Sequence, residues 1–600
     1  LSVGAGGSTL ATLEAPKAGG HLKQTNFRTG DLISIESVDS DAADTKATRV
    51  DGVLIQITRK KIVVGLNAVR GIPYGWHGWC TLRRRSTDIT YRRILEALNG
   101  LLLTEKRPTL HSVLFGDGVA RIEEMQVRFI NGMLNDSQKE AVRAALGAEP
   151  VALVHGPPGT GKTHTVVEIV RQFCLMNKRV LVCAPSNVAV DNLVERLGRT
   201  KSLEIVRLGH PARILPMAAA YSLDTQIRKL DPRSEINELH VQLDLATRDL
   251  SVASPGKRRK LERDIRRMRN KVRRRETKAS KKVIGKSQVV LSTLSGAGSR
   301  FLADQEFDVA IIDEATQASE AECWIAALKA PKLILAGDHH QLPPMTKLRD
   351  VVVKTLFDRV RVQMPGTCRM LTTQYRMHRD IALASSCHLY DGRLVPDCAV
   401  AEHLLCDLGH VKKTENTRKP LVLIDTAGSN MFEQRRSKAK VIDAKSQCNH
   451  GEATQVHKHI KALVSSGVLP GQIAVISPYN AQVRLLRLML EEKYPELEVG
   501  SVDGFQGQEK EAIILTLVRS NKTRSIGFLR DYRRINVAIT RARRHLCVVA
   551  DSSTVSRGSG FLRVLFDHLR DNADIRDVAS KKKKNKKKKE SQLDAVPTIS

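Results

Sequence analysis

Residues 151–163 read VALVHGPPGTGKT, an apolar run followed by a glycine-rich loop that closes with lysine and threonine. The apolar run predicts a buried strand, and the residues after the loop predict a helix. The loop itself, GPPGTGKT (156–163), matches the pattern G-x-x-x-x-G-K-[ST] in full. In this context its backbone N–H groups can surround phosphate groups at the positive end of the helix. The stretch therefore predicts a nucleotide-binding α/β domain.

This loop and a later acidic motif supply the first candidate site residues. Lys162 is expected to reach the β- and γ-phosphates of the nucleotide, and Thr163 to bind Mg²⁺. In AIIDEAT (310–316) a predicted strand ends in two carboxylates, of which Asp313 is expected to bind Mg²⁺ and Glu314 to act as general base. An acidic pair that only caps a helix is the alternative. The loop residues expected to hold the nucleotide are Gly156, Pro157, Pro158, Gly159, Thr160, Gly161, Lys162 and Thr163.

Strand and helix signals alternate along most of the chain, which predicts parallel, doubly wound sheets. They form two sets, and two sets indicate two tandem domains with a cleft between them. Residues 225–285 interrupt the first set with a charged, mostly helical segment. Residues 27–82 instead predict a small antiparallel sheet or barrel, and residues 88–103 a helix. The expected strands after the first one are 179–186, 307–315, 332–338, 420–426, 472–479, 511–520 and 545–551.

Positive charge is concentrated in two places. The chain of 600 residues has a net charge of +33, and residues 257–286 hold 16 Lys and Arg against 3 Asp and Glu. Residues 581–590, KKKKNKKKKE, form a second cluster. Such clusters suit a polyanion such as nucleic acid, whereas a solubilising or localisation signal is the alternative for the tail. The 10 cysteines include no CxxC and fit no common zinc pattern, which favours reduced thiols inside a cell.

Further motifs stand in the order found in superfamily 1 helicases: DEATQ (313–317), GDHHQLPP (337–344), QYRMH (374–378), SVDGFQGQEKEAIIL (501–515) and NVAITRARR (536–544). They resemble the Up-frameshift-like branch, and within it the Smubp-type helicases, over about residues 25–570. The resemblance implies an ATP- and Mg²⁺-dependent 5′-to-3′ helicase or translocase on single-stranded RNA or DNA. A nucleic-acid-stimulated ATPase that clamps or remodels ribonucleoprotein is the alternative. A transport or signalling ATPase is disfavoured, because QYRMH and TRARR would have no role there.

The resemblance also implies roles for single residues of the nucleotide site. Gln138 would read the adenine edge, Tyr375 would stack on the base, and Glu509 would contact the ribose side. Arg376 would contact the γ-phosphate, and Gln341 would sense that phosphate and the attacking water. Each of them could instead be an ordinary polar residue of the cleft.

The arginine-rich stretch RRINVAITRARRH (533–545) predicts a helix with Arg534, Arg541 and His545 on one face. Ile535 and Ile539 would lie on another face, against the sheet. Arg541 resembles the arginine finger of the family, which stabilises transition-state charge on the γ-phosphate. Arg543 points elsewhere and is expected to pair with a carboxylate of its own domain.

Three loops resemble the strand-binding motifs of the family: APSNVAVD (184–191), STLSGAG (292–298) and SPYNAQ (477–482). Small and hydroxyl residues with open backbone N–H groups suit contacts to phosphates, which hold a strand without reading its sequence. Because stacking platforms are few, we expect the protein to hold mainly the backbone. A plain strand-to-helix turn is the alternative for each loop. The implied contacts are Pro185, Ser186, Asn187, Ser292, Thr293, Pro478, Tyr479 and Asn480.

The expected fold is therefore α/β, with two tandem RecA-like P-loop domains, an N-terminal β-barrel and a helical basic insertion. No membrane segment is expected, because no apolar run is long enough. We expect a monomer in the nucleus or cytoplasm, with ribonucleoprotein or the ribosome as candidate partners, and the start at Leu1 rather than Met fits a fragment. The expected parts are 1–20 (disordered), 21–105 (barrel and stalk helix), 106–224 and 286–365 (first RecA-like domain), 225–285 (insertion), 366–575 (second RecA-like domain) and 576–600 (disordered lysine-rich tail).

Overall fold

The strand that precedes the glycine-rich loop lies inside a seven-stranded parallel sheet of order β11-β12-β10-β13-β14-β9-β15. In this computed structural model, β9 is buried along its whole length, as expected for a strand covered on both faces. The strands are β9 (Val151–His155), β10 (Val180–Ala184), β11 (Ile205–Arg207), β12 (Val289–Thr293), β13 (Val309–Ile312), β14 (Lys332–Gly337) and β15 (Cys368–Met370).

The structure describes only part of the chain, and all statements below refer to that part. The described residues are 2–3, 9–14, 27, 31–37, 49–57, 61–66, 80–85, 88–103, 109–200, 203–230, 238–239, 241–243, 245–246, 249, 254–345, 353–435, 446–505, 507–556, 558 and 560–579. The lysine-rich tail was expected to be disordered from residue 576, but Arg576 and Asp577 still belong to a paired strand. The tail from residue 580 onward lies outside the described residues.

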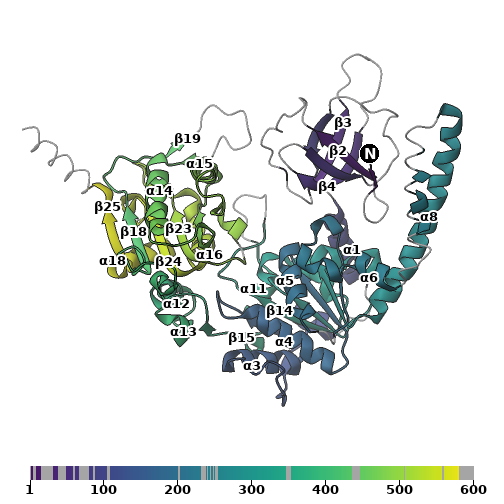
Figure 1. Cartoon of the computed structure of the whole chain (residues 1–600). Coiled ribbons are helices and arrows are strands. Elements are labelled where there is room, and N and C mark those ends of the chain that lie inside the picture. The colour runs from purple at the N-terminus through teal and green to yellow at the C-terminus, as the bar shows by residue number, and fades with distance from the viewer. Residues whose placement is uncertain are drawn as a thin grey trace, which may run out of the picture.

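Helices cover both faces of the first sheet and close two separate apolar cores (Figure 1). Val166, Ile169 and Leu193 fill one core from α4 and α5, and Trp324 and Phe357 belong to the other. The helices of this domain are α2 (Thr109–Phe115), α3 (Asp136–Gly147), α4 (Lys162–Leu175), α5 (Asn187–Gly198), α9 (Leu294–Ala297), α10 (Glu320–Ala327) and α11 (Leu356–Gln363). The first domain is thus doubly wound, as predicted.

A second parallel sheet has six strands in the order β22-β21-β23-β24-β18-β25. Its strands are β18 (Leu421–Asp425), β21 (Ile473–Ile476), β22 (Glu498–Gly500), β23 (Lys510–Thr516), β24 (Ala542–Ala550) and β25 (Asp574–Asp577). The helices around it are α12 (Arg379–Leu389), α13 (Cys398–Ala401), α14 (His450–Ser465), α15 (Asn480–Leu490), α16 (Tyr532–Ile539), α17 (Ser552–Val555) and α18 (Gly560–Asn572). Two RecA-like domains in tandem are therefore confirmed.

The N-terminal part forms a six-stranded antiparallel sheet that is compatible with a barrel. Ile33, Ile35, Leu54 and Val64 make its core. Helix α1 (Ile89–Leu103) connects this sheet to the first RecA-like domain (Figure 1). The strands are β1 (Ser2–Val3), β2 (Thr9–Glu14), β3 (Leu32–Ser37), β4 (Arg49–Ile57), β5 (Lys61–Leu66) and β6 (Cys80–Arg84).

Three expectations need correction. Residues 1–20 were expected to be disordered, but β2 pairs with β5 from Thr9 to Glu14 and adds Ala11 to the core. The first domain was expected to end at residue 365, but β15 pairs with β9 and extends the first sheet to Met370. The helix expected over 533–545 ends at Ile539, because the chain from Ala542 enters β24 in the centre of the sheet.

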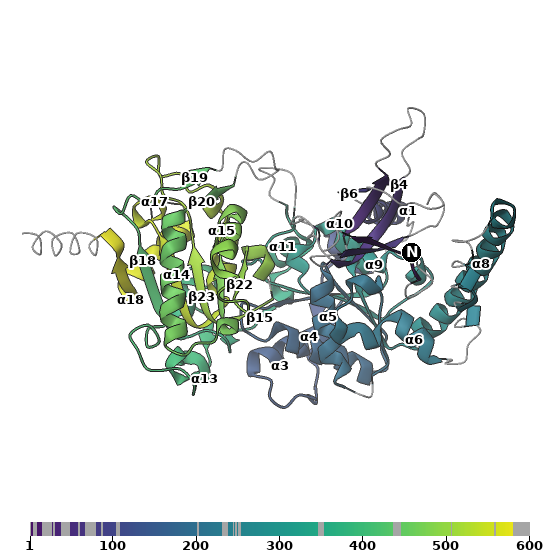
Figure 2. The same cartoon turned by 45° about the horizontal axis from the view of Figure 1, so that its top comes forward.

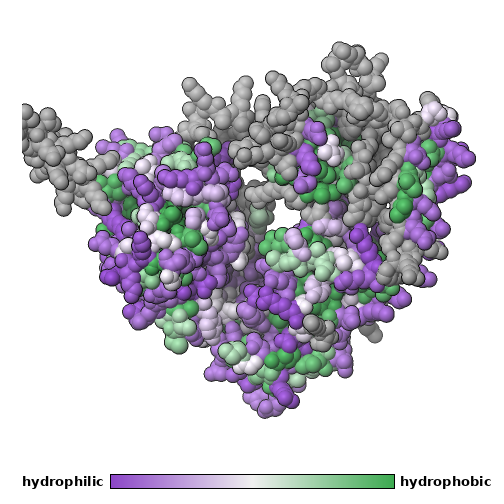
Figure 3. All heavy atoms as spheres, viewed as in Figure 1, coloured by the Kyte–Doolittle hydropathy of each residue, from purple (hydrophilic) through white to green (hydrophobic). Residues whose placement is uncertain are grey.

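The basic insertion is helical, as predicted, and projects from the first domain (Figures 1 and 2). Helix α8 (Pro255–Lys286) lies beyond α6 (Leu223–Leu230). Leu261, Ile265 and Met268 form an apolar stripe that packs on Leu243. The outer side of α8 is hydrophilic (Figure 3). None of the helices in the described part of the chain combines the length and the apolar character that a membrane crossing needs.

The 10 cysteines are all free, and half of them are buried.

The remaining strands are short and form three separate pairs. The short strand pairs are β7 (Arg121–Ile122) with β8 (Ala148–Glu149), β16 (Thr373–Gln374) with β17 (Val395–Pro396), and β19 (Gln434–Arg435) with β20 (Gln447–Cys448).

Candidate nucleotide site between the two parallel sheets

The glycine-rich loop leaves no room for side chains at its glycines. Gly159 and Gly161 have φ of 77° and 76°, a region that L-residues rarely adopt. A Cβ on Gly161 would lie 2.6 Å from Gln138 Nε2, and a Cβ on Gly156 would lie 2.6 Å from Lys162 Cβ. The loop is therefore a tight backbone turn that opens directly into α4 at Lys162, the geometry that suits phosphate binding.

Lys162 contacts both carboxylates of the acidic motif. Its Nζ donates to Glu314 Oε1 at 2.6 Å and also pairs with Asp313 Oδ1. Burial would lower the pKa of Lys162, but the charges of Asp313 and Glu314 and the hydrogen bonds to them outweigh burial and raise it. The phosphates of a nucleotide can compete with these carboxylates for the lysine.

The acidic motif follows β13, and its second acidic residue has a strained backbone conformation. Glu314 has φ of 55°, and its Oε2 accepts a hydrogen bond from Gln317 Nε2 at 2.5 Å. A non-glycine residue in the left-handed region is uncommon and is often found at functional sites. Asp313 is buried and Thr163 is half-buried next to Lys162. The hydroxyl and carboxylate oxygens of Thr163 and Asp313 are the hard donors that fit Mg²⁺.

The QYRMH segment of the second domain lies directly on the glycine-rich loop. The backbone N–H of Tyr375 donates to the carbonyl of Gly159 at 2.9 Å, and a Cβ on Gly159 would lie 2.8 Å from Arg376 Cβ. Arg376 Nε donates to Glu509 Oε2 at 2.5 Å. Burial would raise the pKa of Glu509, but Arg376 outweighs it and lowers this pKa. Arg376 and Glu509, expected on two sides of the nucleotide, are thus ion-paired with each other.

Arg541 reaches the first domain from the start of β24. Its side chain is 2% exposed, and its Nη2 donates to Gln341 Oε1 at 3.4 Å. Burial and the neighbouring Arg376 lower the pKa of Arg541 to about 9, while Glu314 opposes the shift. The guanidinium therefore keeps its positive charge at neutral pH, in a buried position between the domains.

A buried carboxylate that the sequence analysis did not single out holds Gln341 in place. Asp338, directly after β14, accepts hydrogen bonds from Gln341 Nε2 at 2.8 Å, Tyr390 OH at 2.8 Å and His155 Nε2 at 3.1 Å. Asn536 Nδ2 donates to Tyr390 OH at 3.1 Å. Burial would raise the pKa of Asp338, but its hydrogen bonds to His155 and Gln341 lower it. Tyr390 and Asn536 come from the second domain, so this network joins the two domains beside Gln341.

His155, Asp338 and His339 place their ligand atoms within 4.8 Å of one another. Such a group could hold a metal ion, but both oxygens of Asp338 already accept hydrogen bonds from the protein. We therefore assign no metal to it.

Gln138 contacts the glycine-rich loop through its side-chain amide. Its Nε2 donates to the Thr160 carbonyl at 2.9 Å and its Oε1 accepts from the backbone N–H of Asn135 at 3.1 Å, so both ends of the amide are already bonded. One N–H of Nε2 and one lone pair of Oε1 are not used by these bonds, so the reading of an adenine edge by Gln138 stays a prediction. Asn135 Nδ2 also donates to Tyr375 OH at 2.9 Å, although Tyr375 is 40% exposed. Asn135 was missed, although its N-x-x-Q capping pattern with Gln138 was a usable signal.

The loops expected to bind a strand follow β10, β12 and β21 at the carboxyl ends of the two sheets. Ala184 pairs with Thr293, which brings the first two loops together. Two of the expected contacts are wrong as side-chain contacts: Ser292 is fully buried, and Tyr479 is 3% exposed with its OH directed to the Ile526 carbonyl. The other expected contacts, half-buried or exposed, are Pro185, Ser186, Asn187, Thr293, Pro478 and Asn480.

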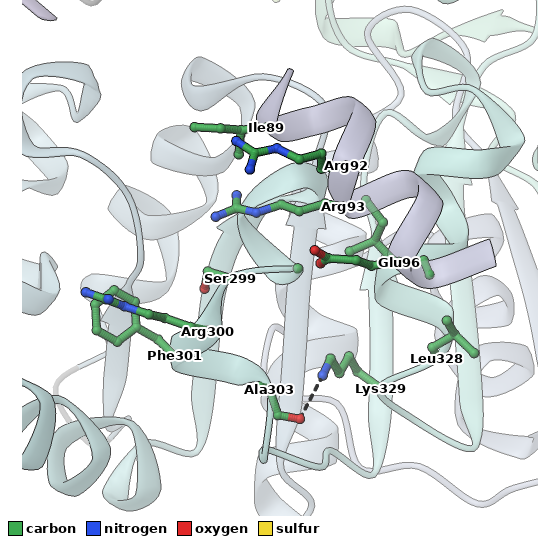
Figure 4. A pocket seen from close by; sticks show the side chains of 13 residues that line it. Ile89, Arg92, Arg93, Glu96, Ser299, Arg300, Phe301, Ala303, Leu328 and Lys329 are labelled. Carbon is green, nitrogen blue, oxygen red and sulfur yellow. Dashed lines mark hydrogen bonds between the residues drawn. The ribbon is translucent and has the colours of Figure 1, made fainter. Parts of the chain in front are cut away.

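A cavity of about 950 Å³ lies away from this site, between α1 and α10 (Figure 4). Arg93 and Lys329 line it, but Arg93 donates to the Ser295 carbonyl at 2.7 Å and Lys329 to the Leu302 carbonyl at 2.8 Å. Both cationic side chains are thus already hydrogen-bonded to backbone carbonyls.

The sheets, the loop and the arginines between the domains define a helicase-type P-loop ATPase. Models of the AAA domain match residues 133–349 and 352–553. DNA polymerase alpha-associated DNA helicase A of Schizosaccharomyces pombe is 40% identical over 597 residues, covering 96% of this chain and 90% of that protein. DNA-binding protein SMUBP-2 of Mesocricetus auratus is 42% identical over 588 residues, covering 95% of this chain. This chain belongs to the superfamily 1 helicases of the Smubp type.

The chain spans 58% of the length of the SMUBP-2 proteins it matches. The crystal structure of an arterivirus nonstructural protein 10 helicase is 11% identical and has a TM-score of 0.36, covering 91% of this chain and 78% of that chain. That likeness is too low to support any argument.

Proposed function

We propose that this chain is an ATP-driven 5′-to-3′ helicase or translocase that acts on single-stranded RNA or DNA. The observation that supports it most is the contact of Arg541 with Gln341, which places a buried cation of one domain beside the hydrolytic residues of the other. The direction of movement rests on the resemblance of the motifs. A monomer is proposed, acting in the nucleus or cytoplasm, with ribonucleoprotein or ribosomal partners.

Hydrolysis is divided between the two domains. Lys162 leaves the carboxylates of Asp313 and Glu314 and binds the β- and γ-phosphates. Glu314, once free of Lys162, takes the proton of the attacking water, and Gln341 orients this water. Thr163 and Asp313 would hold Mg²⁺, which when bound would neutralise charge on the phosphates. Arg376 and Arg541 stabilise the charge that develops on the γ-phosphate.

Movement follows from the same contacts. Arg541, Tyr390 and Asn536 bond to the first domain only while the domains are together. Loss of the γ-phosphate removes an anion that both domains share, which favours opening. A strand held across the carboxyl edges of both sheets would then move relative to one domain in each cycle.

The first test is ATP hydrolysis with and without oligo(dT) or poly(U). We expect either strand to stimulate turnover several-fold, and Lys162→Ala to abolish it. Lys178→Ala, which removes an exposed lysine of the same domain, is the matched control and should behave as wild type. ATP hydrolysis by Lys162→Ala would contradict the assignment of the nucleotide site. An ATP turnover that neither strand stimulates would contradict the proposed action on nucleic acid.

A further inference from the structure

A second cavity, of about 260 Å³, opens at the carboxyl edge of the second sheet. Thr426 follows β18 and Asp551 follows β24, and both line it together with residues 520–522 after β23. The loop after β21, at residues 477–480, ends at the same edge because these strands are parallel. Figure 2 shows α17 and β19 at this end of the domain.

Two cations of the cavity have no acidic partner in the described part of the chain. Lys522 and Arg524 are exposed, and neither forms an ion pair there. The loop that carries them is fixed by Asn521, whose Oδ1 accepts from the Ser525 N–H at 2.9 Å and whose Nδ2 donates to Glu433 at 3.2 Å. Both charges are therefore held over the cavity in a defined loop.

The carboxylate of the cavity does not neutralise these cations. Asp551 is buried and accepts hydrogen bonds from Ser520 Oγ at 2.7 Å, Ser553 Oγ at 2.6 Å and Thr554 Oγ1 at 3.1 Å. These bonds satisfy both of its oxygens within the protein. Two exposed cations outnumber this one buried carboxylate, so the charge accessible to a ligand is positive.

Two further side chains of the cavity lack a partner among the described residues: a hydroxyl without a hydrogen bond and an aromatic ring without a stacking contact. Thr426 is 2% exposed, and its Oγ1 is buried without a hydrogen-bond partner among the described residues. Phe432 is 48% exposed, and its ring stacks on no other described ring. A free aromatic face beside unpaired cations is the combination that binds single-stranded nucleic acid.

We infer that this cavity binds one nucleotide unit of a single strand: Phe432 stacks on the base, Lys522 and Arg524 contact the neighbouring phosphates, and Thr426 Oγ1 bonds to the sugar-phosphate. The inference rests on the proposed function. It adds base stacking to the backbone contacts that the sequence analysis predicted as the main contacts.

The stacking contact is tested with Phe432→Ala on oligo(dT) and on an abasic oligonucleotide of equal length, by fluorescence anisotropy. Stacking contributions translate into a loss of roughly 5- to 150-fold for oligo(dT), with little change for the abasic strand. Leu469→Ala removes an exposed apolar side chain ahead of β21, at the opposite edge of the sheet, and should change neither affinity. Equal losses on both strands, or none, would overturn the stacking role.

The phosphate contacts are tested with the double variant Lys522→Ala, Arg524→Ala. For single strands each lost phosphate contact reduces the slope of log K against log salt by about 0.7, so we expect a reduction of about 1.4. The control Lys458→Ala, Lys461→Ala removes two exposed charges from α14 and should keep the slope. An unchanged slope in the cavity variant overturns the inference while leaving the proposed function intact. If the wild-type chain binds neither strand, the proposed function itself fails.

Discussion

At the scale of the residue, the arginines of residues 533–545 have separate tasks although they share one short segment. Arg543 Nη1 lies 3.4 Å from Glu511, and Arg544 Nε lies 2.8 Å from the same carboxylate, so both stabilise their own domain. Arg541 instead bonds to Gln341 of the other domain and, among the residues that the structure describes, to no carboxylate. Of these three arginines, Arg541 is the one whose side chain bonds to the other domain, beside the candidate nucleotide site.

Replacing Arg541 should therefore separate binding from hydrolysis. We expect Arg541→Ala to lower kcat by about 10³-fold or more, the range known for arginine fingers, while a non-hydrolysable ATP analogue binds within a few-fold of wild type. Single-turnover hydrolysis and analogue titration measure the two effects. Arg530→Ala, at an exposed position of the preceding turn, is the control. Loss of analogue binding would mean that Arg541 has a structural task only.

At the scale of the element, strands β11, β12, β15, β22 and β25 were missed, whereas apolar runs and glycines predicted the other eight strands of the two parallel sheets. Such strands are buried on both faces, so their sequences are almost continuously apolar. The end of α16 was not predictable in this way, because Ala542–His545 has a helical charge pattern but pairs with β23. Strand β2 was missed because residues 1–20 are rich in Gly and Ala and have little local β signal, whereas the strand is formed by pairing with β1 and β5.

Helix α8 offers a prediction at this scale. If its hydrophilic side contacts phosphates, replacing exposed cations by glutamine should keep the helix and weaken strand binding, with a shallower salt dependence. The suitable positions are Lys260, Arg263, Arg266, Lys271 and Arg274. Affinity measured at several salt concentrations checks this, with Lys260→Arg, Lys271→Arg as the charge-retaining control. An unchanged slope would make α8 a solvated surface without a role in binding.

At the scale of the whole molecule, the candidate site exists only where the two domains meet. The sequence motifs identified Lys162, Glu314 and Arg541, because each has a recognisable pattern around it. The network of Asp338, Tyr390 and Asn536 was not predictable, since its members are far apart in the chain and have no shared local pattern. Their contacts form because the two domains pack against each other. Through Asp338, these contacts connect the domain interface to Gln341.

The central claim is that hydrolysis between the domains drives movement along a strand. Strand displacement on duplexes with a 5′ or a 3′ single-stranded tail tests it most directly, with Lys162→Ala as the inactive control. The account predicts ATP-dependent displacement of the 5′-tailed duplex and little on the 3′-tailed one. Displacement of the 3′-tailed duplex alone would reverse the direction. Stimulated ATP hydrolysis without displacement of either duplex would contradict the motor and identify the chain as an ATP-dependent clamp.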